Sequence, residues 1–244
     1  MEENVLILGA TSDMAVAIAR QLALEGYSIT LAARNTDRLS ALEGDLRVRH
    51  KAMVSSARFD ALDFKSHEAF YQSLPEKPDI VICVFGFLGE QSEAQRNWGH
   101  CHEIIDSNYT GAVSILNIVA NDFERRKKGV IVGISSVAGE RGRQSNYIYG
   151  SAKAAFTAYL SGLRNRLFHH GVHVVTVKPG FVKTKMIENL TTPAILTASP
   201  AKVASSISKA IRGKKNTVFV LSVWSLIMFV IRSIPEGVFK RLKM

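Results

Sequence analysis

Short strand-like runs alternate with segments of helical spacing along most of this chain. The segments 14–26 and 102–126 repeat apolar residues three and four positions apart, which is typical of amphipathic helices. The runs at 79–86 and 129–136 are nearly continuous in apolar residues, as in strands buried on both faces of a sheet. The alternation predicts a parallel sheet that helices cover on both faces. The strand-like runs are residues 4–10, 28–34, 57–63, 79–86, 129–136, 172–180 and 217–221.

The predicted fold class is therefore α/β, a doubly wound Rossmann-type parallel sheet of about seven strands. A chain of 244 residues, 47% of them apolar, is long enough to bury a sizeable core in one such domain. We assign this domain to residues 1–221. Residues 222–244 form a C-terminal extension, first apolar and then basic, beyond the last expected strand. Ligands of such sheets bind at the carboxyl ends of the strands.

The formal charge of +10, from 31 basic and 21 acidic residues, points to anionic partners. The basic residues form small clusters at 125–128, 141–143, 183–185 and 239–244. Aromatic residues do not alternate with them as in single-strand-binding proteins, so we expect no nucleic-acid partner. Negatively charged small molecules or lipids fit the pattern better.

The cysteines and the N-terminus favour a cytoplasmic protein. Cys83 and Cys101 lie far apart and match no metal-ligand spacing, so we expect no metal site and a reducing compartment. The chain begins MEENVLILG, with acidic residues where a signal peptide carries positive charge.

The first strand-to-helix connection reads LGATSDMA over residues 8–15. Gly9 at the strand end allows a sharp turn, and the hydroxyls of Thr11 and Ser12 precede the helix. The backbone N–H groups and the positive dipole end of that helix can bind a phosphate. The same residues also suit an ordinary helix N-cap, so the turn alone leaves both interpretations open.

Residues 145–153 read SNYIYGSAK and contain two tyrosines and one lysine. Tyr149 and Lys153 are four positions apart, so a helix places them on one face, where both can reach one ligand. Tyr147 falls on a different face. Ser136 lies 13 residues before Tyr149, at the end of a predicted strand. A serine, a tyrosine and a lysine in this order, after a phosphate-binding turn, favour a catalytic site over a buried tyrosine near a solvated lysine.

Together these motifs resemble the short-chain dehydrogenase/reductase family over residues 4–221. The resemblance implies that the catalytic residues are Asn108, Ser136, Tyr149 and Lys153. It also implies a dinucleotide site at the first turn, at the ends of the next strands, on the catalytic helix and at the Pro-Gly motif after the sixth strand. The implied cofactor-binding residues are Gly9, Thr11, Ser12, Asp13, Met14, Arg34, Asn35, Asp60, Ala61, Gly86, Tyr149, Lys153, Pro179, Gly180, Val182 and Thr184.

Two positions depart from the family pattern. The family turn usually carries three glycines, and here Asp13 and Ala15 replace the second and third. Alanine is accepted at the third position. Asp13 suits a helix start, although its charge lies near the expected pyrophosphate. After the fourth strand, the Asn-Asn-Ala-Gly motif of the family is replaced by residues 83–86, of which only Gly86 matches, so we expect mainly backbone contacts there.

The end of the second strand reads Ala33, Arg34, Asn35. Enzymes that use NAD place an acid there to bind the ribose 2′-hydroxyl, whereas an arginine accommodates a 2′-phosphate. The sequence therefore favours NADP(H), the alternative being an ordinary surface arginine.

The resemblance implies carbonyl reduction by hydride transfer from the nicotinamide. Tyr149 is expected to protonate the forming alkoxide and Ser136 to donate a hydrogen bond to the same oxygen. A free tyrosine has a pKa of about 10, and we expect Lys153 and the oxidised cofactor to lower it. Lys153 is also expected to bind the ribose, and Asn108 to brace its helix and a water relay.

Within the family, the stretches RGRQSNYIYG and KPGFVKTKM and the C-terminal extension resemble reductases of decaprenylphosphoryl-2-keto-ribose, which act on a keto-sugar carried by a polyprenyl phosphate. Arg141 and Arg143, between Ser136 and Tyr149, are then the expected ligands of the substrate phosphate. The alternatives are a reductase of a soluble ketone or acyl-thioester, and a non-catalytic NADP-binding sensor, which the complete catalytic set disfavours.

Residues 224–231 read WSLIMFVI, which as a helix is apolar on all sides. The uncharged stretch 216–231 has 16 residues and includes the last strand. It is therefore short of the roughly 20 residues that a membrane span needs. With the basic residues at 239–243, the pattern favours a helix in the membrane interface, at the inner face of the cytoplasmic membrane. A subunit interface of a homodimer or homotetramer is the alternative.

Overall fold

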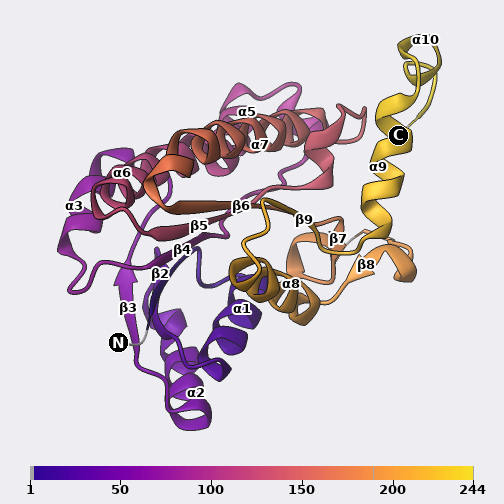
Figure 1. Ribbon diagram of the computed structural model, residues 1–244. Helices are drawn as coiled ribbons and strands as arrows, with labels where there is room; N and C mark the ends of the chain where they lie inside the picture. Colours follow the sequence, from indigo (N-terminus) through magenta and orange to yellow (C-terminus); the bar gives the residue numbers. More distant parts are fainter. Residues whose placement is uncertain (1–2, 189, 244) are drawn as a thin grey trace.

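A computed structural model describes residues 3–188 and 190–243 of the chain. Seven parallel strands form one sheet in the order β3-β2-β1-β4-β5-β6-β9 (Figure 1), which confirms the predicted doubly wound fold. The strand order reverses between β1 and β4, the position at which such sheets bind ligands. The strands of the sheet are β1 (Asn4–Leu8), β2 (Ser28–Ala33), β3 (Val54–Arg58), β4 (Ile80–Cys83), β5 (Gly129–Ile134), β6 (Val172–Lys178) and β9 (Thr217–Phe219).

Helices cover both faces of the sheet, and the chain continues past β9 into two further helices (Figure 1). One face carries α1 (Asp13–Leu24), α2 (Ser40–His50) and α8 (Pro200–Arg212). The other carries α3 (His67–Ser73), α4 (Gln91–Ala94), α5 (Trp98–Ile105), α6 (Gly111–Arg126) and α7 (Tyr147–Leu167). The remaining elements are β7 (Phe181–Val182), β8 (Thr197–Ala198), α9 (Val223–Ser233), α10 (Glu236–Phe239) and the short helices η1 (Asp37–Leu39), η2 (Phe64–Ser66), η4 (Val137–Glu140), η5 (Phe168–His170), η6 (Lys185–Ile187) and η7 (Ala194–Leu196).

The core consists of two apolar layers with the sheet between them. In β1, Val5 and Ile7 pack in the layer of α1 and α8, whereas Leu6 and Leu8 pack in the layer of α6 and α7. All four side chains are fully buried. Burial on both faces explains why the first strand is continuously apolar instead of alternating.

The third strand begins earlier than predicted. It spans Val54–Arg58, not 57–63, and pairs with β2 at the edge of the sheet. The prediction was wrong because Ser55 and Ser56 are exposed on this edge strand, so no apolar run marks it. Residues 60–63 form a turn instead, in which the Asp60 carboxylate accepts the N–H of Leu62 at 3.0 Å.

The helix predicted over residues 102–126 contains one irregular turn. A π-helical turn, η3 (Asp106–Thr110), separates α5 from α6. Such turns insert an extra residue into a helix and occur frequently at functional sites. Here the turn carries Asn108, whose side chain is buried.

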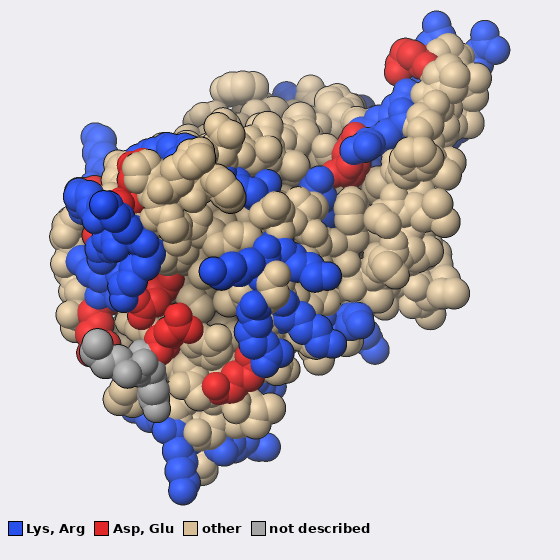
Figure 2. All heavy atoms as spheres, viewed as in Figure 1, with Lys and Arg blue, Asp and Glu red and all other residues tan. Residues whose placement is uncertain are grey.

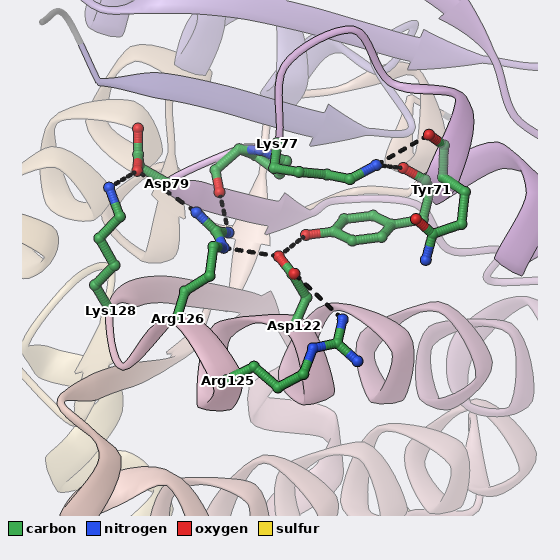
Figure 3. A network of polar contacts seen from close by, with 9 residues as sticks. Tyr71, Lys77, Asp79, Asp122, Arg125, Arg126 and Lys128 are labelled. Atoms are coloured by element: carbon green, nitrogen blue, oxygen red, sulfur yellow. Dashed lines mark hydrogen bonds and ion pairs between the residues drawn. The ribbon is translucent and has the colours of Figure 1, made fainter.

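A buried polar network connects α3 and α6 to the start of β4 (Figure 3). It lies at the amino ends of the strands, opposite the carboxyl ends that bind ligands. The Asp122 carboxylate accepts the Tyr71 hydroxyl at 2.8 Å and the Arg126 guanidinium at 2.8 Å. Arg126 also donates to the Pro78 carbonyl at 2.6 Å. Burial and the Asp122 hydrogen bond raise the pKa of Tyr71. Because each buried polar group has a partner, the network stabilises this end of the domain without an unpaired charge.

The C-terminal extension is packed against the domain through one side of α9. Trp224, Met228 and Ile231 are buried there against Val137. The opposite side stays exposed, and Figure 1 shows α9 and α10 reaching away from the sheet. The extension is therefore not apolar and exposed on all sides, because one side of α9 is buried against the domain. In the part of the chain that the structure describes, no helix combines the length and apolar character of a membrane span.

Candidate active site

Two neighbouring cavities lie at the carboxyl ends of the strands. The first, of about 440 Å³, extends from the β1–α1 turn across the ends of β2, β3 and β4. The second, of about 130 Å³, lies between the loop after β5, helix α7 and the Pro-Gly motif after β6. Met14, Gly86 and Thr184 line both, so the cavities adjoin.

The β1–α1 turn has the geometry of a phosphate-binding turn. Gly9 has a φ of +89°, and a Cβ added there would lie 2.8 Å from the Phe85 backbone nitrogen, so no side chain fits. The Ser12 hydroxyl caps α1 by accepting the Ala15 N–H at 3.2 Å. Asp13 and Met14, the first residues of α1, line the first cavity, where an anion would meet the positive end of the helix dipole.

Asp13, which stands where the family has glycine, is held by a residue from far along the chain. Its carboxylate accepts the backbone N–H of Lys185 at 2.8 Å. The two residues both line the first cavity. The contact explains how an acid is accommodated at this turn, since its charge has a backbone donor and lies at a helix N-terminus.

The structure brings most of the predicted cofactor residues together, and the chemistry of the lining fits a dinucleotide. The cavity combines a glycine turn at a helix start, a cationic side chain at the end of β2 and a glycine at the end of β4. Those that line the first cavity are Gly9, Thr11, Ser12, Asp13, Met14, Arg34, Asp60, Ala61, Gly86 and Thr184. Those that line the second are Met14, Gly86, Tyr149, Lys153, Pro179, Gly180, Val182 and Thr184.

Asn35 is placed differently from the expectation. It lines neither of the two cavities, and its side-chain oxygen accepts the Asp37 N–H at 3.0 Å, which starts η1. Arg38, one turn further, lines the first cavity together with Arg34. The sequence analysis missed Arg38 because its position depends on the short helix η1, which no motif marks.

Asn108 lies behind the cavity wall. Its side chain is buried, donates to the carbonyls of Phe87 at 2.6 Å and Ile104 at 2.8 Å, and accepts the Phe87 N–H at 3.3 Å. A Cβ added at Gly86 would lie 2.7 Å from the Asn108 side-chain oxygen. The asparagine therefore braces the loop after β4 against the π-helical turn, and Gly86 permits this close approach.

Tyr149, Lys153 and Ser136 all line the second cavity. Tyr149 and Lys153 follow one another along one side of α7, and the Lys153 nitrogen lies 5.7 Å from the centre of the Tyr149 ring. Lys153 is buried and donates to the Ile134 carbonyl at 3.1 Å. Tyr147 is 44% exposed and lines neither of the two cavities, so of the two tyrosines only Tyr149 is in position.

Burial controls the protonation of these groups. It raises the pKa of Tyr149 to about 12, and the hydrogen bond with Ser136 opposes this shift. It lowers the pKa of Lys153 to about 8, because an ammonium ion is costly in an apolar surrounding. The lowering of the tyrosine pKa that we expected from Lys153 does not arise from the protein alone. Tyr149 is consequently a protonated hydrogen donor at neutral pH, the form that carbonyl reduction requires.

Trp224, from α9, is a wall of the second cavity that motif comparison did not find. Its ring packs on Gly180, where a Cβ would lie 2.0 Å from the indole nitrogen, and meets the Phe181 ring edge-on at 5.6 Å between centres. The indole donates to the Leu196 carbonyl at 3.1 Å. The only sequence signal was the apolar character of the extension.

The two arginines expected at the substrate lie in different places. Arg143 lines the second cavity, and its guanidinium forms no hydrogen bond or ion pair with any residue that the structure describes. Its partial burial lowers the pKa of its guanidinium. Arg141 instead donates to carbonyls at the end of α9, including Ile231 at 2.7 Å and Ile234 at 2.6 Å. The expected substrate contact of Arg141 was wrong, because sequence distance to Tyr149 could not show the acceptors that α9 offers.

Comparison with known proteins agrees with this geometry. The sequence pattern described as short chain dehydrogenase matches residues 3–194. The chain belongs to the short-chain dehydrogenase family. An uncharacterized oxidoreductase of Mycobacterium tuberculosis is 36% identical over 98% of this chain and 96% of its own length. Sulfoacetaldehyde reductase 2 of Chromohalobacter salexigens is 32% identical over 76% and 75%. A short-chain dehydrogenase from Sphingobium yanoikuyae, solved in complex with NADPH, superposes with a TM-score of 0.81 at 22% identity, covering 96% of this chain and 97% of that one.

As a short-chain dehydrogenase, the protein is an oxidoreductase that interconverts alcohols and carbonyl compounds with a nicotinamide cofactor. That cofactor, when bound, supplies or accepts the hydride. The residues of this chain hold the other partners in place. Ser136 and Tyr149 can both donate hydrogen bonds to an oxygen atom in the second cavity, and Tyr149 holds the proton that an alkoxide would take. Lys153 lines the second cavity, and its ammonium nitrogen lies close to Gly86, 3.3 Å from where an added Cβ would be.

Replacing Tyr149 by phenylalanine should lower the rate of carbonyl reduction by about 10²- to 10⁴-fold, because the general acid is lost. Cofactor binding, followed by fluorescence titration, should persist because the first cavity is unchanged. Tyr147→Phe is the matched control and should retain most activity. Equal losses in the two variants would contradict the assignment of Tyr149.

Proposed function

We propose that the protein is an NADPH-dependent carbonyl reductase. The observation that carries the cofactor preference is the pair Arg34 and Arg38 at the wall of the first cavity, at the end of β2. In related dinucleotide-binding sheets, an arginine near the end of the second strand binds the 2′-phosphate of NADP(H). Neither arginine has a hydrogen-bond or ion-pair partner among the residues that the structure describes, so both guanidinium groups are available to a phosphate. The Sphingobium yanoikuyae protein of the same fold was solved with NADPH.

Arg34→Asp should move the preference from NADPH toward NADH, because a carboxylate repels the 2′-phosphate and accepts from a 2′-hydroxyl. The measurement is kcat/KM for each cofactor with one carbonyl substrate. Lys65→Asp, which changes the charge of a surface residue outside both cavities by the same amount, serves as control. An unchanged ratio of the two cofactors in Arg34→Asp would make Arg34 an ordinary surface residue.

The substrate that the site favours is a carbonyl compound with a negatively charged group, and we propose a keto-sugar carried by a polyprenyl phosphate. The second cavity is lined mainly by apolar residues such as Val137, Leu190 and Trp224, with Arg143 as an unpaired cation. A guanidinium without a protein partner in an apolar cavity is well suited to bind a phosphate or sulfonate. Sulfoacetaldehyde reductase, by its name, acts on a sulfonated aldehyde. A soluble ketone or acyl-thioester is the second candidate, while the complete set of Ser136, Tyr149 and Lys153 disfavours a sensor without turnover.

Arg143→Ala should lower kcat/KM about tenfold or more for a phosphorylated keto-sugar such as xylulose 5-phosphate, the order expected for one charged hydrogen bond. The kcat/KM for a neutral ketone such as cyclohexanone should change little. Lys183→Ala removes a nearby exposed cation that lines neither of the two cavities and provides the control. If Arg143→Ala affects both substrates alike, or neither, the arginine is not an anion ligand.

We also propose that α9 rests on the inner face of the cytoplasmic membrane. Its outer side exposes Leu226, Phe229 and Val230, which are 64%, 63% and 54% accessible. The chain beyond it adds basic residues, and Figure 2 shows blue side chains at the far tip of the projection, next to a red one, while charged atoms of both signs line one side and the other side is uncharged. An apolar stripe flanked by basic residues suits an anionic membrane surface. A subunit interface of a homodimer or homotetramer would cover the same stripe.

Phe229→Glu should reduce cosedimentation with phosphatidylglycerol vesicles severalfold, because it places a charge in the apolar stripe. Phe168→Glu is the control, since Phe168 is a phenylalanine of similar exposure, 72%, that follows the C-terminal end of α7 and lies outside α9. Sedimentation of the protein without vesicles distinguishes the alternative. Loss of a dimer in Phe229→Glu, with no binding of the unaltered protein to vesicles, would replace the membrane by a second subunit.

A further inference from the structure

The loop that carries Ser136 is held from outside by the C-terminal helix. Ser136 lies two residues after the end of β5 and caps η4, its hydroxyl accepting the Ala138 N–H at 3.1 Å. The next residue, Val137, packs against the buried side of α9. The last residue of η4 is Glu140, and Arg141 follows directly. We call these two residues the Glu140–Arg141 clamp. Both follow Ser136 in the loop, and the side chains of both contact the C-terminal extension.

Glu140 connects three elements. Its side chain is only 5% exposed, and its two oxygens meet the Lys178 ammonium at 2.6 Å and the Arg232 guanidinium at 3.0 Å. Lys178 is the last residue of β6, directly before the Pro-Gly motif, and Arg232 lies in the last turn of α9. A carboxylate this buried costs free energy unless both oxygens are paired, so the three elements are fixed relative to one another.

Arg141 caps the end of α9. Its guanidinium donates to the carbonyls of Ile231 and Ile234, is paired with the Glu236 carboxylate at 2.9 Å, and stacks on the Phe239 ring at 3.7 Å. The last carbonyls of a helix lack partners within the helix and carry its negative dipole end. A guanidinium supplies several donors in one plane, which lysine cannot reproduce. The helix end and the serine loop therefore stabilise each other.

We propose that the Glu140–Arg141 clamp and α9 position the Ser136 hydroxyl for catalysis, so that Arg141 is a positioning residue and the C-terminal extension is a component of the active site. The inference rests on the proposed role of Ser136 as a hydrogen-bond donor to the substrate oxygen. Small displacements of such a donor are costly, because its hydrogen bond must point at the oxygen where charge develops.

The test is a double-mutant cycle of Arg141 and Ser136 on kcat. Arg141→Ala should lower kcat about 10- to 100-fold, equally for the anionic and the neutral carbonyl substrate, while NADPH binding changes little. In a Ser136→Ala background the same substitution should cost almost nothing, because a residue that acts through Ser136 has no effect once Ser136 is gone. Multiplicative losses in the double variant, or a loss confined to the anionic substrate, would overturn the proposal.

Two further variants keep the test decisive. Glu236→Gln removes only the exposed ion pair of Arg141 and should leave kcat unchanged, since exposed pairs contribute little. If Arg141→Ala does not fold, the cycle is run with Arg141→Lys, which keeps the charge but not the planar fork and should give a smaller loss of the same kind. Full activity of Arg141→Ala together with the expected loss in Tyr149→Phe would refute the clamp alone, whereas undiminished activity in Tyr149→Phe would refute the proposed function.

Discussion

All seven strands of the sheet run in one direction, and every functional feature depends on this. Parallel strands place all their carboxyl ends on the same side of the sheet. Gly9, Gly86, Ser136 and Pro179 therefore meet there, although they are far apart in the sequence. The amino ends of the strands lie on the opposite side, where the Tyr71–Asp122–Arg126 network joins helices to the sheet (Figure 3). Buried polar pairs thus stabilise the amino ends of the strands, whereas polar groups at the carboxyl ends stay free for ligands.

Within the site, burial has opposite effects on two neighbouring groups. It makes the tyrosine a weaker acid and the lysine a weaker base, and both shifts favour the uncharged forms. A neutral tyrosine is the form that can give a proton to a substrate. An ammonium group with a pKa of about 8 stays mostly charged at neutral pH, so the pair combines a proton donor with a nearby positive charge.

Local patterns in the sequence were enough to predict the fold, the β1–α1 turn and that Tyr149, not Tyr147, shares a helix face with Lys153. Each depends on spacing within one element or on the order of elements along the chain. The prediction failed for Arg141 and could not account for Asp13, because their partners, at Ile231 and Lys185, are distant in sequence. The strand β3 was misplaced for another reason, since an exposed edge strand carries no apolar run. Arg38 and Trp224 were missed because no motif marks them.

The packing of α9 on the serine loop also has a consequence for biosynthesis. Helix α9 follows every strand of the sheet in the chain, so a ribosome produces it after the phosphate turn, Ser136, Tyr149 and Lys153. Domains fold as synthesis proceeds from the N-terminus. A nascent chain can therefore complete its parallel sheet up to β6 while Glu140 still lacks Arg232, and Arg141 still lacks its carbonyl acceptors. If α9 positions Ser136 as proposed, the catalytic loop reaches its final arrangement only after α9 has been synthesised.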